Sequence, residues 1–235
     1  MSSRGAPAST ITASVEFASI LRHAMLTPLS GIVLWCDMIR RNTPMSDSLD
    51  RALIAIDHSA RAQVAILDNV VEVSRMQSGS TQLARSSVDI SACIDDVILQ
   101  NVSVAKQREV SLRFAAPPGE MTVHGDPVRL RAALHNLVDN AVNNSPRGGT
   151  VEVRLDAIEN SIAIHVTDQG GGIVPEALPD LFKIASLSEA GLMSRRGGLG
   201  LGLAVARWIV TLHGGKLAHK PNTPTGCIFT ISLPR

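Results

Sequence analysis

The first third of the chain repeats apolar residues at helical spacing. In a helix that begins near residue 13, one face is predicted to carry Phe17, Ile20, Leu21 and Met25. A second run at steps of three or four follows Asp47, the expected N-cap. Pro28 lies inside the first run, and an internal proline bends a helix. The pattern predicts a helical hairpin over residues 13–80, after a flexible leader of residues 1–12.

The predicted hairpin has an apolar stripe on each helix, and a single hairpin cannot bury both stripes. Two copies can bury them in a four-helix bundle, so we expect a homodimer through the hairpin. The alternative is that the hairpin packs on the downstream part of its own chain.

Short apolar strands alternate with helices in residues 81–235. Strands are expected at residues 88–91, 110–114, 151–155, 161–166, 216–219 and 227–233, and helices at residues 92–106, 126–144 and 202–212. Asp126 and Pro127 suit the N-cap and the first position of the second of these helices. The predicted fold class is α+β: a helical hairpin that forms a dimeric four-helix bundle, followed by an α/β sandwich of one sheet covered by helices.

The composition narrows the range of partners without identifying one. A net charge of +1 gives no general attraction to nucleic acid, and 3% aromatic residues with no Tyr leave no stacking platform for single strands. No uninterrupted apolar run reaches the ~18 residues of a membrane span, and the N-terminus lacks the apolar core of a signal peptide. The three cysteines are widely spaced and suit buried thiols in a reducing compartment. We therefore expect a cytoplasmic chain with no nucleic acid partner and no membrane span.

A run of alternating glycines opens directly into a predicted helix. It contains Gly198, Gly200 and Gly202, with Leu201 and Leu203 between and after them. Glycine lets a backbone approach a ligand closely, and the free N–H groups of a helix N-terminus favour phosphate. The run indicates a phosphate-binding loop, and the alternative is a flexible loop without a ligand.

A second cluster, Asp168 with Gly170 and Gly172, follows a predicted strand. An acidic side chain there can accept a hydrogen bond from an exocyclic amine, and the glycines leave room for a flat base. The alternative is an ordinary turn at the end of a strand.

Asparagines gather in the helix predicted over residues 126–144. Asn136 and Asn140 lie one turn apart on the same face, and Asn143 and Asn144 follow. Asn is a poor helix former, whereas its amide oxygen can bind Mg²⁺ and its amide nitrogen can donate to phosphate. The alternative is a group of surface amides near a fraying helix end.

In this order, the three clusters resemble the nucleotide-binding domain shared by histidine kinases, gyrase-type topoisomerases, Hsp90 chaperones and mismatch-repair ATPases. The resemblance implies a set of ATP-binding residues: Asn136, Asn140, Asn143, Asp168, Gly170, Gly172, Phe182, Gly198, Gly200, Leu201, Gly202 and Leu203. Within this set, it implies that Asp168 recognises adenine and that Asn140 also holds Mg²⁺. The glycine run would hold the phosphates beside a mobile lid that contains Phe182.

The start of the chain resembles the phosphoacceptor box of histidine kinases, which reads His-Glu-Leu-Arg-Thr-Pro-Leu. The match keeps His23, Thr27, Pro28 and Leu29, and later segments most resemble hybrid-type sensor kinases. The resemblance implies that His23 takes phosphate from ATP with Mg²⁺ and passes it to an aspartate in the receiver domain of a response regulator. No sensor segment is visible, so we expect the signal to come from a separate sensor protein or from a domain of a longer chain.

Several residues depart from the family pattern. Ala24 stands where the family has an acidic residue that takes a proton from the imidazole, and Leu26 replaces an Arg. Losing a positioned base costs roughly 10²–10⁴ in rate, so weak autophosphorylation is expected. Thr27, which in related kinases orients the water that hydrolyses phospho-aspartate, is kept, so the alternative function is a phosphatase or a non-catalytic docking scaffold. Ala185 replaces the usual aromatic partner of Phe182, which predicts a loosely held lid.

Overall fold

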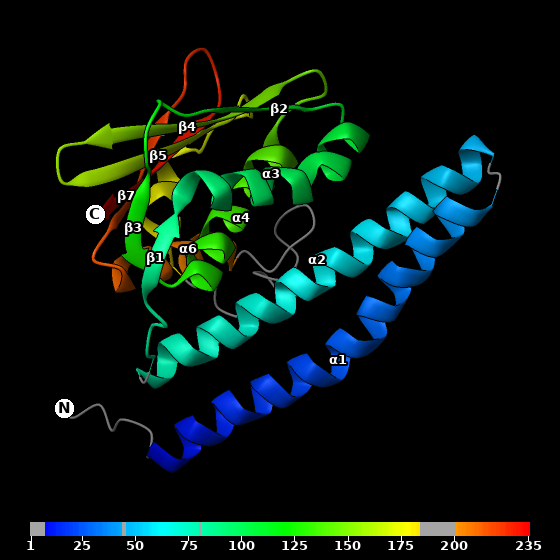
Figure 1. Ribbon diagram of the computed structural model, residues 1–235, viewed down its shortest axis with the longest axis horizontal. Helices are drawn as coiled ribbons and strands as arrows, with labels where there is room; N and C mark the ends of the chain where they lie inside the picture. Colours follow the sequence, from blue (N-terminus) through cyan, green and yellow to red (C-terminus); the bar gives the residue numbers. More distant parts are fainter. Residues whose placement is uncertain (1–7, 44–45, 80, 184–200) are drawn as a thin grey trace. The chain divides into compact units, whose positions relative to one another are not determined.

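The chain divides into two compact units, Met1–Thr81 and Gln82–Arg235. The computed structural model describes residues 8–43, 46–79, 81–183 and 201–235, with the backbone alone for residues 8–17 and 58. Figure 1 labels the helices and strands of both units.

The first unit is a hairpin of two long helices, α1 (Ala8–Asn42) and α2 (Asp47–Ser78). α1 begins before the expected residue 13 and contains Pro28, and Figure 1 shows that it bends along its length. The N-cap of α2 is Ser46 and not the predicted Asp47, because Ser46 Oγ accepts a hydrogen bond from Leu49 N at 3.4 Å. Asp47 lies in the first turn instead, where its charge favours the helix dipole.

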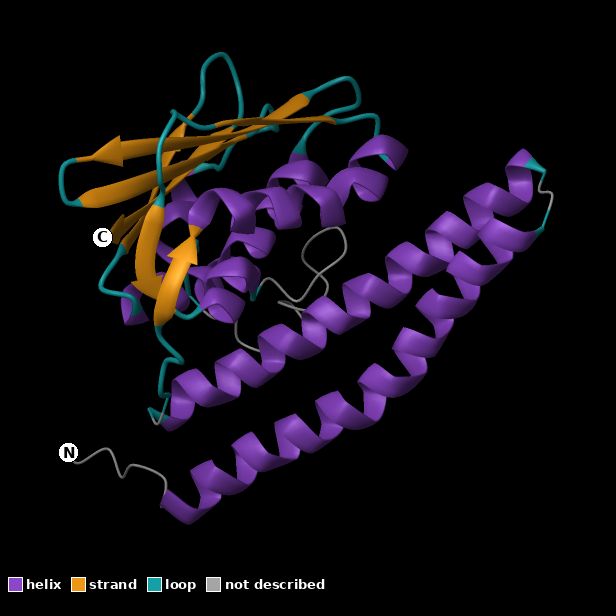
Figure 2. Cartoon of the chain, viewed as in Figure 1, coloured by secondary structure: helices purple, strands orange, loops and turns teal. Residues whose placement is uncertain are grey.

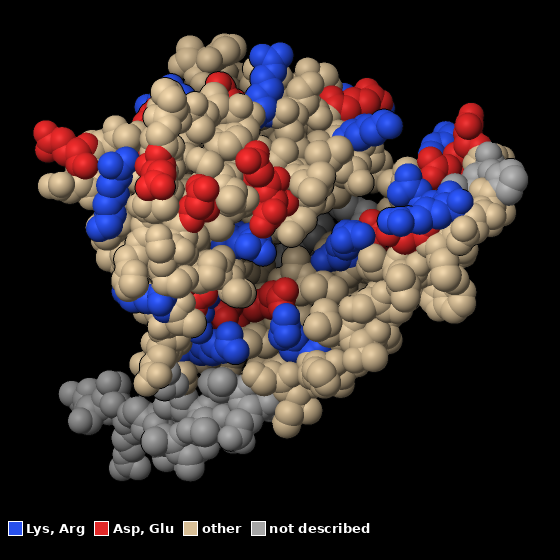
Figure 3. All heavy atoms as spheres, viewed as in Figure 1, with Lys and Arg blue, Asp and Glu red and all other residues tan. Residues whose placement is uncertain are grey.

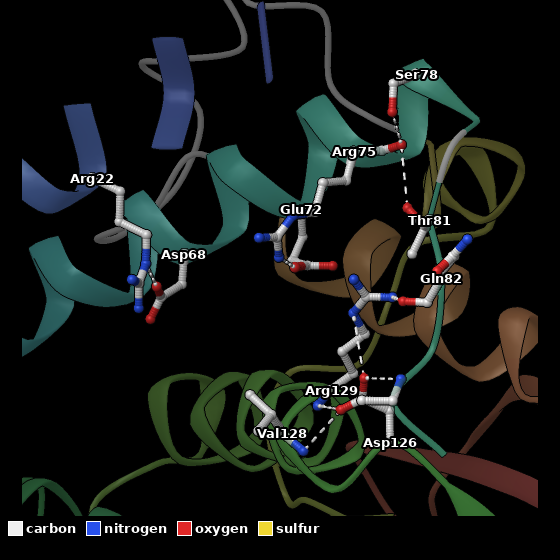
Figure 4. Close-up of polar contacts among 11 residues, drawn as sticks. Arg22, Asp68, Glu72, Arg75, Ser78, Thr81, Gln82, Asp126, Val128 and Arg129 are labelled. Atoms are coloured by element: carbon white, nitrogen blue, oxygen red, sulfur yellow. Dashed lines mark hydrogen bonds and ion pairs between the residues drawn. The ribbon is translucent and has the colours of Figure 1, made fainter. Parts of the chain in front are cut away.

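Opposite charges pair across the hairpin. Arg22 is paired with Asp68, as Figure 4 shows, and Arg40 Nε lies 3.0 Å from Asp50 Oδ1 near the connection between the helices. Both pairs match antiparallel helices in a single register. On the face drawn in Figure 3, basic and acidic side chains are interspersed, in keeping with the net charge of +1.

The hairpin buries one apolar face and exposes another. The buried residues include Leu29, Cys36, Leu53, Ala60 and Val71. Helical steps of three, four and seven residues place a second, exposed stripe on α1: Leu21, Met25, Ile32, Trp35 and Ile39. Ala18–Asn42 is long and apolar enough to cross a membrane by length and composition alone, with a mean hydropathy of 1.2 and 11% of the window buried. A stripe this apolar calls for a partner surface.

The described part of the second unit has two sheets and three α-helices. The larger sheet has the strand order β2-β4-β5-β7-β6, and β1 pairs with β3 in a separate two-stranded sheet. The strands are β1 (Ser86–Asp89), β2 (Ser111–Ala115), β3 (Thr122–Gly125), β4 (Thr150–Ile158), β5 (Ser161–Thr167), β6 (Lys216–Pro221) and β7 (Cys227–Pro234). The helices are α3 (Ile90–Gln107), α4 (Pro127–Asn144) and α6 (Gly202–Leu212), with a 3₁₀ turn, η1 (Pro175–Asp180). Figure 2 shows the three helices on one face of the larger sheet, which confirms the predicted α/β sandwich.

Alternation along the strands decides which side of the sheet faces the helices. β4 buries Val151, Val153 and Leu155, whereas Glu152 and Arg154 are exposed. The buried stripe of α4 is Leu130, Ala133, Leu134, Leu137, Val138, Ala141 and Val142. β2 pairs with β4 in parallel, and the other pairs of this sheet are antiparallel. The core therefore lies between the apolar side of the sheet and the helices.

The boundaries near β1 differ from the prediction. β1 ends at Asp89, because this residue is the N-cap of α3 and its Oδ1 accepts hydrogen bonds from Ser91 N and Ala92 N. The sequence does not predict β3, because a strand of four residues, paired with β1 in the part of the chain that the structure describes, is too short to show alternation. The predicted roles of Asp126 as N-cap and Pro127 as first residue of α4 are confirmed.

Candidate functional site

Asp168 follows β5 directly and is only 2% exposed. Its Oδ1 accepts hydrogen bonds from Gly170 N at 2.8 Å and from Cys227 N at 3.2 Å. Burial raises the pKa of Asp168, and the two N–H donors oppose that effect. Within the described part of the chain, Oδ2 receives no hydrogen bond, so this oxygen remains an acceptor for a ligand.

Residues near the C-terminus hold this loop in place. Asn222 Nδ2 donates to Asp168 O at 2.8 Å. Gly226 has φ +112°, and a Cβ there would lie 2.0 Å from Asp168 O, so only glycine fits. Gly172, at φ +74°, uses the same freedom to turn the chain after the loop. Sequence reasoning missed Asn222, Gly226 and Cys227, and the only available signal was a glycine at the entry to the last strand.

The Asp168 loop also lies against the C-terminal end of α4. A Cβ at Gly170 would lie 2.7 Å from Asn144 O, so the two backbones approach closely. Asn144 Nδ2 donates to Asn140 O at 2.7 Å and to Asn140 Oδ1 at 3.1 Å, which orients the Asn140 amide. Asn143 is tied in through its carbonyl oxygen, which accepts a hydrogen bond from Arg108 Nη2 at 2.6 Å. The acidic loop therefore lies beside the end of α4 that carries Asn140 and Asn144, whereas the Asn143 contact is made by its backbone and does not bring its side chain to the loop.

The first turn of α6 meets Asn136. A Cβ at Gly202 would lie 3.1 Å from Asn136 Oδ1. Leu201 is buried at the N-cap position and makes no side-chain capping hydrogen bond, and Leu203 is half-buried. Leu201 therefore supplies no side-chain cap to the first N–H groups of α6, which lie at the positive end of the helix dipole. This arrangement suits phosphate groups beside Asn136.

Phe182 is anchored at the start of the predicted lid. Its ring packs edge-on against Phe229 with the ring centres 6.4 Å apart, and the Arg207 guanidinium lies 5.3 Å from the ring centre. Gly198, Gly200 and Ala185 lie outside the described residues. The predicted looseness of the lid therefore stays a prediction, but its first aromatic residue has two partners.

The two residues predicted for catalysis lie on α1. His23 and Thr27 are both exposed, and Thr27 Oγ1 donates to His23 O at 3.3 Å. Ala24 is also exposed and provides no proton acceptor. As far as the structure describes the chain, the His23 ring has no hydrogen bond or ion pair, so it is open to a reaction partner.

Two protein families match the chain. Residues 13–79 match the His Kinase A (phospho-acceptor) domain, and residues 125–235 match the histidine kinase-, DNA gyrase B- and HSP90-like ATPases. The first match contains His23 and the second contains α4, the Asp168 loop and α6.

The similar sequences are sensor kinases. Sensor-like histidine kinase SenX3 of Mycobacterium tuberculosis is 28% identical over 219 residues, which are 93% of this chain and 53% of SenX3. Histidine protein kinase DivJ of Caulobacter vibrioides is 29% identical over 221 residues, 93% of this chain and 37% of DivJ. The chain thus spans about half the length of these curated relatives, or less.

The similar structures are also histidine kinases. Full-length ShkA in complex with AMPPNP has a TM-score of 0.66 at 23% identity, covering 94% of this chain and 46% of ShkA. Histidine kinase ThkA in complex with response regulator protein TrrA has a TM-score of 0.60 at 18% identity, and the match covers 93% of this chain and 61% of the matched chain. These two show a shared fold. The mycobacterial sensor histidine kinase MprB is 31% identical with a TM-score of 0.55, and the match covers 64% of this chain and 97% of the MprB chain. With both domain matches in their expected order, this chain belongs to the sensor histidine kinase family.

Proposed function

We propose that this chain is an ATP-dependent protein histidine kinase, in which His23 takes the γ-phosphoryl group of ATP and passes it to an aspartate of a response regulator. One observation carries the proposal: an exposed histidine in a phosphoacceptor domain is joined, in one chain, to a nucleotide-type site around Asp168. Two proteins of similar fold support the proposal: ShkA was solved with AMPPNP, in keeping with ATP binding, and ThkA with the response regulator TrrA, in keeping with transfer to a regulator.

Asp168 suits the recognition of adenine. Its Oδ2 can accept a hydrogen bond from the exocyclic amine, while the two backbone donors hold Oδ1. The phosphates suit the N-terminus of α6, where Leu201 supplies no side-chain cap and Gly202 leaves room beside Asn136. Phe182 would contribute an apolar contact to the nucleotide, held in place by its packing against Phe229.

Mg²⁺ fits this site only together with the phosphates. The described residues contain no group of three or more His, Cys, Asp or Glu side chains that could hold a metal ion. Mg²⁺ in nucleotide sites typically takes one or two protein oxygens, and phosphates and water supply the rest of its octahedron. We assign Asn140 Oδ1, which Asn144 orients, as the protein oxygen. When bound, Mg²⁺ would neutralise charge on the transferring phosphoryl group.

At His23, a ring nitrogen forms the N–P bond while the bond from the γ-phosphorus to the bridging oxygen breaks and ADP leaves with the electron pair. The proton on the other ring nitrogen must then leave. Ala24 cannot accept it, so water or a distant base does, and we expect a rate roughly 10²–10⁴ below that of a positioned base, or about 3–5 kcal/mol of barrier. In the second step an aspartate oxygen of the regulator forms the O–P bond as the N–P bond breaks.

Ala24 and Thr27 together favour a second function. A chain with weak kinase activity can still hydrolyse the phospho-aspartate of the regulator, or bind the regulator as a non-catalytic docking scaffold. Thr27 keeps an exposed hydroxyl one turn from His23, which suits the positioning of a hydrolytic water.

We propose that the exposed stripe of α1 pairs with the same stripe of a second copy in a cytoplasmic four-helix bundle. The core of a four-helix bundle needs apolar side chains of the kind that give Ala18–Asn42 its high hydropathy. A bundle would therefore explain the apolar character of this segment without a membrane. The signal would reach this dimer from a sensor on a separate protein or domain.

The test is incubation of the full chain with Mg²⁺ and ATP labelled at the γ-phosphate, beside a His23→Ala variant. Label that is stable in alkali, lost in acid and absent from the variant supports the kinase. Unlabelled protein that still binds nucleotide contradicts it. In that case, phosphate release from a phosphorylated regulator that Thr27→Ala abolishes would support the phosphatase.

A further inference from the structure

Residues 82–85, the joining segment with which the second unit begins, are fastened to the first turn of α4. Asp126 Oδ1 accepts hydrogen bonds from Val128 N and Arg129 N, both at 3.1 Å, and its Oδ2 accepts one from Ala84 N at 3.1 Å. Arg129 Nη1 donates to Gln82 O at 3.3 Å. Figure 4 shows these contacts converging on Asp126 and Arg129. We name the side chains of Asp126 and Arg129, with the backbone of Gln82 and Ala84, the linker clamp.

The charged pair of the linker clamp is largely buried. The Arg129 and Asp126 side chains are 12% and 9% exposed, and Arg129 Nε lies 4.0 Å from Asp126 Oδ2. The Arg129 guanidinium also lies 5.9 Å from the ring centre of Trp208 on α6. Removing one charge of a buried pair leaves the other uncompensated, so the clamp is more than a loose surface contact.

The C-terminal end of α6 is held at the same place. Asp126 N donates to His213 Nε2 at 2.9 Å, and His213 Nδ1 donates to Ile209 O at 2.7 Å. From the joining segment, Arg85 Nη2 donates to Leu212 O at 3.1 Å. The segment therefore touches both α4 and α6, at the ends of these helices where the clamp lies.

The two helices meet again at the nucleotide site, where Gly202 of α6 lies against Asn136 of α4. Because α4 and α6 are rigid elements, a contact that fixes their relative orientation at the clamp also fixes it at the nucleotide site, where Gly202 faces Asn136. We infer that Arg129 is a positioning residue: by fastening residues 82–85 to α4, it raises the affinity of the site for nucleotide. Coupling between two binding events is reciprocal, so nucleotide in turn tightens the clamp. The inference rests on the proposed function, because it needs ATP to bind beside Asp168.

The test uses the full chain with an Arg129→Met substitution, which keeps an apolar stem and removes the charge. The matched control is Arg131→Met on the same helix, where the ion pair with Asp96 is about half exposed at 42% and 53%. We expect the Kd for ATP with Mg²⁺ to rise about 5-fold or more in Arg129→Met, the range of a typical coupling, and to stay unchanged in the control. In the unmodified chain, nucleotide should also slow hydrogen exchange at the Ala84 amide, a readout that needs no variant.

The outcomes separate the two proposals. Arg129→Met with a lower melting temperature, an unchanged Kd and an Ala84 amide that does not respond to nucleotide overturns the inference and leaves the proposed function standing. An unmodified chain that binds no nucleotide overturns both. A raised Kd with normal melting, restored in part by Arg129→Lys, supports positioning over general stability.

Discussion

Asp168→Asn separates ligand recognition from folding at this site. The Asn carbonyl oxygen can replace Oδ1 and keep both hydrogen bonds, from Gly170 N and Cys227 N, so the loop geometry is retained. The amide nitrogen then replaces Oδ2, and a donor faces the exocyclic amine where an acceptor stood. A hydrogen bond to a charged group contributes about 1.5–3 kcal/mol, so the affinity for ATP should fall about 10–150-fold.

The same substitution should not lower the stability of the fold. Burial raises the pKa of Asp168 above its ordinary 3.8, so the folded chain binds this proton more readily than the unfolded chain. The ionised carboxylate therefore costs folding free energy at neutral pH, and this cost decreases as pH falls through the folded pKa toward the ordinary value of 3.8. The asparagine removes the cost. Its advantage should be largest near pH 7 and should shrink in acid.

The assay combines nucleotide titration calorimetry with thermal melts of Asp168→Asn and the unmodified chain at neutral and acidic pH. Weak binding with a melting temperature at or above that of the unmodified chain supports the assignment of Oδ2 to the base. Unchanged affinity would refute that assignment. Weak binding together with a strongly lowered melting temperature would mean that the carboxylate holds the loop together instead.

Three further changes test the Asp168 loop, the buried His213 and the exposed stripe of α1. Gly226→Ala places a Cβ 2.0 Å from Asp168 O at φ +112°, so urea denaturation should show a loss of about 2–5 kcal/mol, and an unchanged midpoint would contradict the close approach. Burial lowers the pKa of His213 from its ordinary 6.5, so its contribution to stability is present above that value and is lost as pH falls toward the folded pKa. Melting temperatures of the unmodified chain should therefore drop more steeply from pH 7 to pH 5 than those of His213→Gln, and parallel curves would argue against this origin. Trp35→Glu, at a side chain 61% exposed in the single chain, should convert a dimer to a monomer in analytical ultracentrifugation, whereas a monomeric unmodified chain would remove the dimer proposal.

The elements that could be predicted are those with local signals. Two adjacent residues, Asp126 and Pro127, predict the start of α4, and in the structure they are its N-cap and its first residue. The predicted N-cap of α2 was wrong by one residue, because Ser46 and Asp47 are both good capping residues. The extended backbone of Ser46, with φ −74° and ψ 153°, makes it the cap. β3 was not predicted because, among the described strands, it pairs with β1 alone, and α3 and β2 separate the two in the sequence.

The residues of the site that belong to a local motif could be predicted from the sequence. Those that are distant in the sequence and reach the site through the fold could not. Asp168 follows from its glycine neighbours, but its support by Cys227 depends on the pairing of β5 with β7, where Thr167 lies opposite Ile228. The contact of Asn144 with the Asn140 amide depends on side-chain orientation, which no sequence pattern specifies.

The most direct test of the central claim is mass spectrometry of the full chain after incubation with ATP and Mg²⁺, with peptide mapping under alkaline conditions that preserve phosphohistidine. We predict that the mass of one phosphoryl group appears on the peptide containing His23, is absent from His23→Ala, and is strongly reduced in Asp168→Asn at ATP concentrations well below the Kd of that variant. A chain that binds ATP yet gains no phosphoryl group, or gains it at another residue, would contradict the account.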